Sequence, residues 1–116
     1  MFHYLIFFAM KLKVHSIHFD ADQKLVRFIQ KKIDKLETFY HRLVDGEVFL
    51  RLNNEGIENK TVEIKLNVPG TQLFAIEKAR SFEAAADQAA DALRMQLEKF
   101  KARKKGKKKQ VPEPAQ

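Results

Sequence analysis

Histidine side chains are the first candidates for catalysis in this sequence, because imidazole binds metals and transfers protons near neutral pH. His15 and His18 lie three residues apart in a segment with a strand pattern, so their side chains point to opposite faces and cannot share one metal ion. His18 could form a hydrolytic or metal site with Asp20 and Asp22, but both carboxylates are explained more simply as caps of a following helix. The histidines therefore indicate no metal or catalytic centre.

The sequence also lacks the other residue patterns on which enzymes depend. It contains no cysteine, which excludes a disulfide scaffold, a zinc ribbon and a thiol nucleophile, and nothing indicates an oxidising compartment. It has no glycine-rich phosphate loop and no paired nucleophile and base. We therefore expect a cytoplasmic protein that is not an enzyme, that needs no metal or cofactor and that has no small-molecule substrate.

The positive charge of the chain is concentrated at its C-terminal end. The net charge is +7, yet residues 1–98 contain 14 Lys/Arg and 14 Asp/Glu, whereas residues 99–116 contain 8 Lys/Arg against Glu113 alone. Clustered cations favour a polyanionic partner, because binding to nucleic acid releases its condensed counterions. A solubilising end without a partner is the alternative for this segment taken alone.

Two amphipathic helices are predicted from apolar residues at three- and four-residue spacing. The first covers 22–40, and the basic side chains Lys24, Arg27, Lys31 and Lys35 form a separate stripe along it. The second begins after Ser81, a plausible N-cap, and extends to about 105. The predicted apolar positions are Leu25, Val26, Ile29, Ile33, Leu36 and Tyr40 in the first helix and Phe82, Ala86, Ala89, Leu93, Leu97 and Phe100 in the second.

Four segments have the alternating pattern of strands, at 11–19, 47–52, 60–68 and 71–79. In the last of them, Leu73 and Ala75 compete with Phe74 and Ile76 for the inward face. The predicted fold class is α+β, in the order β-α-β-β-β-α, with a four-stranded mixed sheet and two helices packed on one face. The strands that flank the first helix should be parallel, and the later hairpins antiparallel.

The two ends of the chain are expected to lie outside this domain. Residues 1–9 form an apolar leader that is too short to span a bilayer, and we favour Met10 as the native start. A hydrophobic tail that binds a membrane or partner, or an added strand, is the alternative for the leader. Residues 10–105 form the folded domain, and 106–116 are predicted to be a disordered basic tail.

Basic side chains with aromatic rings between them suit RNA, because phosphates supply affinity and rings stack on unpaired bases. Phe49, on the polar side of its strand, and Phe28 and Phe39, at the edge of the apolar face of the first helix, are the candidate rings, with peripheral core as the alternative for each. These patterns indicate a small α+β domain that binds nucleic acid.

Three stretches of the sequence resemble a known family. Residues 10–19 (Met-Lys-Leu-Lys-Val-His-Ser-Ile-His-Phe) and 25–39 are similar to the first strand and the Lys-Leu-x-Lys-Leu-Glu helix of the ribosome hibernation promoting factors, also called the ribosome-associated inhibitor or sigma-54 modulation family. Residues 81–101 are similar to the second helix of that family, with its Ala-Ala-x-Asp and Leu-x-x-Gln-Leu-x-Lys patterns. The chain resembles the short form, which lacks a C-terminal dimerisation domain.

The resemblance implies a bacterial stress-response protein that inhibits translation. It would be monomeric away from the ribosome, would bind small-subunit ribosomal RNA across the messenger and transfer-RNA sites in stationary phase, and would favour either paired or single inactive ribosomes. The RNA-binding residues carried over are Lys24, Arg27, Lys31, Lys35, Arg94, Lys99, Lys101, Arg103, Lys104 and Lys105, with Lys11 and Lys13 as weaker candidates. The alternatives are a regulatory protein-interaction module that binds an acidic partner and a general RNA chaperone.

Overall fold

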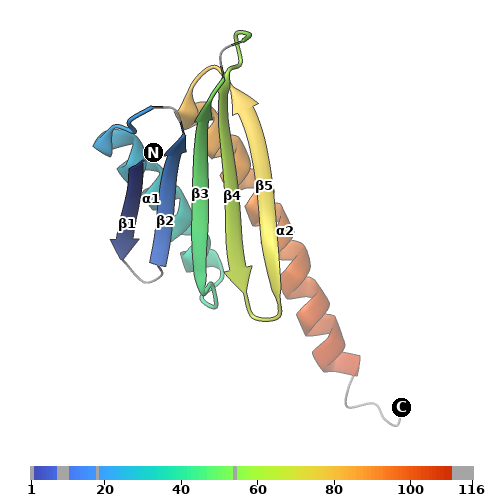
Figure 1. Cartoon of the computed structure of the whole chain (residues 1–116). Coiled ribbons are helices and arrows are strands. Elements are labelled where there is room, and N and C mark those ends of the chain that lie inside the picture. The colour runs from blue at the N-terminus through green and yellow to red at the C-terminus, as the bar shows by residue number, and fades with distance from the viewer. Residues whose placement is uncertain (1, 8–10, 18, 54, 111–116) are drawn as a thin grey trace.

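The computed structural model describes the backbone of residues 2–7, 11–17, 19–53 and 55–110, and the side chains of 12–17, 19–53 and 55–103. The elements in this part of the chain are β1 (Phe2–Phe7), β2 (Lys11–Ile17), α1 (Gln23–Phe39), β3 (Asp45–Leu52), β4 (Lys60–Val68), β5 (Thr71–Ala79) and α2 (Phe82–Gln110). The strands form one sheet in the order β1-β2-β3-β4-β5. Both helices cover the same face of this sheet, and its other face is open (Figure 1).

The predicted β-α-β-β-β-α order is confirmed for residues 11–110. β2 and β3 are parallel because α1 crosses over between them, and β3-β4 and β4-β5 are antiparallel hairpins. Gly70 adopts a φ of +88° in the β4–β5 turn, a left-handed conformation that glycine reaches without a steric penalty. The mixed sheet therefore brings β2, from the start of the chain, beside β3.

A fifth strand, β1, extends the predicted four-stranded sheet at its edge. β1 pairs antiparallel with β2, from Phe2 opposite Ser16 to Phe7 opposite Lys11. Its sequence, Phe-His-Tyr-Leu-Ile-Phe, is rich in aromatic and branched residues that favour strands, and it lies close enough in sequence to β2 to form a hairpin. Of the alternatives for the leader, the structure thus shows the added strand for residues 2–7, while a native start at Met10 stays a prediction.

Both predicted helix caps are present. The Asp22 carboxylate accepts a hydrogen bond from the Lys24 backbone N–H at 3.0 Å, and the Ser81 hydroxyl accepts one from the Ala84 N–H at 3.0 Å. These bonds satisfy backbone donors that have no partner within the first turn of a helix. The sequence therefore sets the start of each helix locally.

The chain was predicted to be disordered from Gly106, whereas the structure describes α2 as a helix to Gln110; the disorder of the tail stays a prediction. Lysine and glutamine are good helix formers, and a single glycine inside a helix costs only about 1 kcal/mol. The packed part of α2 already supplies the nucleus, so each further residue adds a backbone hydrogen bond. α2 extends past the end of the sheet (Figure 1), and residues 111–116 lie outside the described part.

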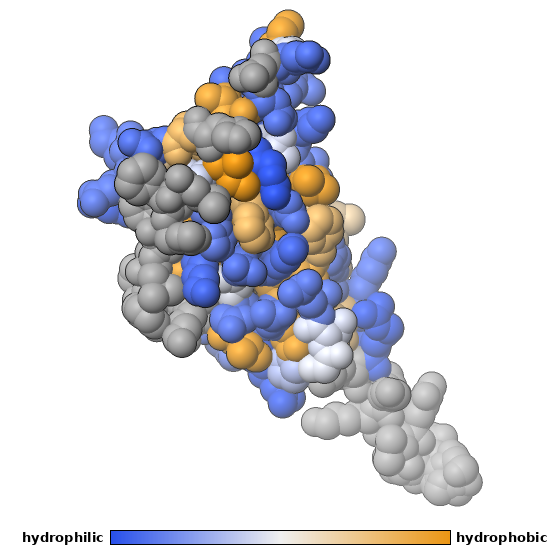
Figure 2. Space-filling model, in the orientation of Figure 1, coloured by the Kyte–Doolittle hydropathy of each residue, from blue (hydrophilic) through white to orange (hydrophobic). Residues whose placement is uncertain are grey.

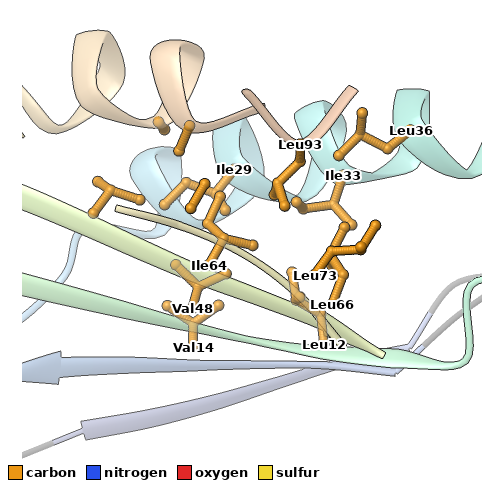
Figure 3. Close-up of a cluster of buried hydrophobic side chains, with 14 of the residues drawn as sticks. Leu12, Val14, Ile29, Ile33, Leu36, Val48, Ile64, Leu66, Leu73 and Leu93 are labelled. Atoms are coloured by element: carbon orange, nitrogen blue, oxygen red, sulfur yellow. The ribbon is translucent and has the colours of Figure 1, made fainter. Parts of the chain in front are cut away.

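The core lies between the open-faced sheet and the two helices (Figure 3). Val14, Val48 and Ile64 line up across three neighbouring strands and are 0–1% exposed. Above them lie Ile29 and Ile33 of α1, which are both fully buried. The core also contains Leu12, Leu36, Leu66, Leu73 and Leu93.

The packing of β5 decides which of its two residue sets faces inward. Leu73 and Ala75 are buried and pair with Leu66 and Ile64 of β4, whereas Phe74 is 43% exposed on the other face. The helix above β5 is lined with small residues, namely Ala85, Ala86 and Ala89. Because these alanines bring α2 close to the sheet, the smaller set fits beneath the helix and the larger set points outward.

Candidate nucleic-acid interface

Four exposed cations line the side of α1 that faces away from the core. Lys24, Arg27, Lys31 and Lys35, here called the α1 basic stripe, are all exposed, and Ile29 and Ile33 on the opposite side are buried. Among the described residues no carboxylate pairs with any of the four; Arg27 donates only to the Gln23 side chain, at 3.2 Å. The stripe therefore offers four positive charges that the fold does not neutralise.

Lys32 borders this stripe but holds the two helices together. Its ammonium group pairs with the carboxylate of Asp87 on α2 and lies 5.3 Å from the centroid of the Phe28 ring. Phe28 is half-buried, which agrees with the peripheral-core alternative for this ring. Lys32 thus joins α1 to α2, and Phe28 packs beside it at the edge of the core.

Phe39, the last residue of α1, is held by two cations of α2 that were predicted to bind RNA. The Lys101 ammonium lies 4.3 Å from the ring centroid and donates a hydrogen bond to the Phe39 carbonyl at 3.2 Å. The Arg94 guanidinium lies 5.4 Å from the same ring. Because a carbonyl at the end of a helix has no partner within the helix, Lys101 acts as a cap for α1. Both cations therefore have a structural contact as well as an exposed charge.

The other predicted α2 residues do not form one patch with these two. Lys99 and Arg103 are exposed and follow Gln96 at three- and seven-residue spacing, which places them on the side of α2 that faces β5. Lys13 lies on the open face of the sheet, opposite Glu47. The side chains of Lys11, Lys104 and Lys105 lie outside the described part. The structure thus brings Arg94 and Lys101 toward α1 and away from Lys99, Arg103 and Lys13.

A groove of about 490 Å³ runs between α1 and α2 beside the α1 basic stripe. It is lined by Lys32, Lys35, Leu36, Thr38, Phe39, Asp87, Ala90, Asp91 and Arg94. Its α1 wall is basic, its α2 wall carries both signs of charge, and apolar Leu36 and Ala90 lie between the two. Here the fold combines charged and apolar groups that are far apart in the sequence.

The open face of the sheet holds a ring cluster whose full extent was not predicted from the sequence. His15 stacks on Phe49 at 4.7 Å, and the cations of Arg51 and Lys65 lie 5.4 and 5.3 Å from the Phe49 ring. The only sequence signal was a phenylalanine on the polar side of a strand. Figure 2, which views this face, shows apolar residues scattered among polar ones.

Carboxylates neutralise much of this sheet cluster. Glu63 pairs with both Arg51 and Lys65, and Glu47 lies 3.0 Å from the ring nitrogen Nε2 of His15. His15 is only 9% exposed and covers one side of the Phe49 ring. A base can therefore reach Phe49 less easily than the sequence suggested, and the open face offers phosphates less unpaired charge than α1 does.

Two other features are absent from the described residues. No group of three or more His, Asp or Glu side chains lies close enough to hold a metal ion within that part of the chain. None of the described helices is both long and apolar enough to cross a membrane.

Comparison with known proteins identifies the family. Residues 12–105 match the family described as sigma 54 modulation protein / S30EA ribosomal protein. The chain belongs to this family. A ribosome hibernation promotion factor of Deinococcus radiodurans is 31% identical over 106 residues, and a ribosome hibernation promoting factor of Pseudomonas putida is 27% identical over 92 residues. This sigma-54 modulation family is the one that the sequence was found to resemble.

The coverage differs between these relatives. The matched region is 84% of this chain but only 54% of the Deinococcus protein, so the chain spans about half the length of that relative. The region matched with the Pseudomonas protein is 79% of this chain and 87% of that protein.

Two solved structures share the fold. The N-terminal domain of Thermus thermophilus Protein Y superposes with a TM-score of 0.67, at 22% identity, over 75% of this chain and 93% of that chain. A ribosomal subunit interface protein of Coxiella burnetii superposes with a TM-score of 0.71, at 19% identity, over 78% and 97%. The predicted α+β fold is thus confirmed by two structures that share little sequence with this chain.

Proposed function

We propose that this protein binds the small ribosomal subunit through ribosomal RNA and keeps ribosomes inactive when growth slows. Its family, and relatives named as ribosome hibernation factors, support this function. The observation that carries the proposal is the α1 basic stripe, whose four cations are exposed and unpaired on a rigid helix. Between Lys24 and Lys35 the stripe extends roughly 16 Å along the helix axis, enough to contact several phosphates.

A rigid helix contributes orientation as well as affinity. Ile29 and Ile33, on the buried side of α1, anchor the helix to the sheet, and the Lys101 cap holds its C-terminal end. Phosphate contacts from such a helix set the position of the whole domain on the RNA. In this proposal the domain occupies the messenger and transfer-RNA sites, acts in the cytoplasm and catalyses no reaction.

The extended end of α2 supplies further attraction in this proposal. Lys99 and Arg103 are exposed, and the sequence that follows contains five more lysines among residues 104–109. These cations would add affinity for RNA without choosing the binding site, because the α1 basic stripe lies on another part of the molecule. In this proposal the C-terminal cations add affinity, and the α1 basic stripe sets the binding site.

Sedimentation of stationary-phase extracts on sucrose gradients tests the proposal. The protein should migrate with small subunits and whole ribosomes, and purified protein should compete there with initiator transfer RNA. Migration with free RNA or at the top of the gradient would instead favour an RNA chaperone or a protein-interaction module.

A matched pair of variants tests the role of the stripe. The double substitution Arg27→Glu and Lys31→Glu should abolish ribosome binding, because it replaces two attractive charges with two repulsive ones. Lys78→Glu with Arg80→Glu changes the net charge equally at exposed positions outside α1, and should retain most of the binding. Equal loss in both variants would contradict the assignment of the site to α1.

A further inference from the structure

The groove between α1 and α2 has a layout that general attraction to phosphates does not require. Two of its lining residues, Asp87 and Asp91, are acidic, although acidic groups repel RNA. Asp87 is neutralised by Lys32. Asp91 is exposed and makes no hydrogen bond or ion pair with any described residue. The groove therefore contains one unpaired acceptor among cations.

Contacts between the helices mark the two ends of the groove. The pair between Lys32 and Asp87 joins the helices at one end, and at the other Phe39 lies beneath Arg94. Lys32 and Phe39 are seven residues apart on α1, or roughly 10 Å along the axis. This length suits one nucleotide and is too short for a duplex.

The groups between these ends match the parts of a ribonucleotide. Lys35 is exposed and unpaired, and Arg94 has a carboxylate partner only at 3.8 Å, in Glu98, so both can bind a phosphate. Asp91 can accept a hydrogen bond from a ribose hydroxyl, as acidic side chains do in nucleotide sites. Leu36 and Ala90 provide the apolar surface against which a sugar or base can lie.

We propose that this groove holds one nucleotide of single-stranded RNA, with its phosphate on Lys35 and Arg94 and its ribose 2′-hydroxyl donating to Asp91. The inference rests on the proposed function, because it assumes that the helical side of the protein faces RNA. It adds a means by which the protein distinguishes ribose from a sugar that has no 2′-hydroxyl to donate a hydrogen bond. The α1 basic stripe alone gives no such distinction, since the phosphates of a strand with a 2′-hydroxyl and of a strand without one are the same.

Fluorescence anisotropy with the full chain tests this site against two probes. One is a short single-stranded RNA, and the other has the same base sequence with every ribose 2′-O-methylated, so that it keeps the phosphates and loses the 2′ donor. The wild-type protein should bind the RNA about tenfold more tightly than the methylated probe, because a hydrogen bond to a charged acceptor is lost. Asp91→Ala should reduce this ratio to about one, and it should not weaken binding of the methylated probe.

Glu83→Ala is the matched control, because Glu83 is an exposed carboxylate on the same helix that does not line the groove. It removes the same charge and should leave the ratio at its wild-type value. Circular dichroism of each variant confirms that the helices are intact. Lys35→Ala should weaken binding of both probes to a similar degree, as expected for a phosphate contact.

The outcomes separate this inference from the proposed function. A wild-type ratio near one, or a ratio that Asp91→Ala leaves unchanged, would overturn the nucleotide site while RNA binding stands. The Asp91→Ala and Lys35→Ala variants could also bind both probes as the wild type does but bind ribosomes more weakly. That result would assign the groove to a ribosomal protein and would overturn the nucleotide site. Failure of the wild-type chain to bind ribosomes or either probe would instead remove the proposed function itself.

Discussion

Gln96 of α2 pairs with both backbone groups of Phe74 on the edge strand β5. Its amide nitrogen Nε2 donates to the Phe74 carbonyl at 2.7 Å, and the Phe74 N–H donates to the Gln96 Oε1 at 3.3 Å. A side-chain amide thus takes the place that a further strand would occupy at this edge. Because an uncovered edge can pair with another chain, this contact both stabilises α2 on the sheet and protects the edge.

Substitution of Gln96 should destabilise the protein and expose the edge of β5. We expect Gln96→Ala to lower the free energy of unfolding by about 1–2 kcal/mol, since both hydrogen bonds are lost. Urea denaturation measures this change, and light scattering should detect more self-association near the transition. Gln88→Ala, at an exposed position of the same helix, is the control and should change neither quantity. Equal stability of the two variants would show that the Phe74 contact contributes nothing.

Lys101 and Lys99 should separate a structural role from an RNA-binding one. Lys101→Gln removes the cap of α1 and the contact with the Phe39 ring, so it should cost about 1 kcal/mol of stability. Lys99→Gln should leave thermal stability unchanged, because Lys99 is exposed and has no partner among the described residues. Both should weaken RNA binding through the loss of one charge. A Tm that falls equally in the two variants would refute the capping role.

Truncation after Arg103 should reduce affinity without changing the binding site. It removes five lysines, so the dependence of ribosome binding on salt concentration should become less steep. The wild-type affinity should fall by orders of magnitude between about 50 and 200 mM salt. Competition with initiator transfer RNA should persist, because the α1 basic stripe remains. If the truncated protein loses this competition while the Arg27→Glu/Lys31→Glu variant keeps it, the C-terminal lysines are the effector.

Translation from Met10 should give a protein that still folds cooperatively. The described core is built from residues between Leu12 and Phe100, which join β2 to the other strands and to both helices. Loss of β1 makes β2 the edge of the sheet, so we expect lower stability together with a single thermal transition. Calorimetry measures both properties. A broad, non-cooperative transition would show that β1 belongs to the folding unit.

Local patterns were sufficient to predict most of the fold. The helix caps at Asp22 and Ser81 depend on groups two or three residues away, and the alternation in β4 depends on its own sequence. The inward face of β5 could not be predicted in this way, because both of its residue sets are apolar. The choice between Leu73 and Phe74 was made by α2, which packs over the strand.

The sequence by itself determined the order of elements from β2 to α2, the start of each helix, the α1 basic stripe and the C-terminal excess of charge, because each depends on neighbours along the chain. The tertiary structure alone decided which cations are available to a partner. Lys101 and Phe39 are 62 residues apart, and the capping contact between them exists only because α1 and α2 pack side by side. Asp91 became a candidate acceptor for the same reason, since a carboxylate and a lysine from different helices share a groove only after the sheet has brought those helices together.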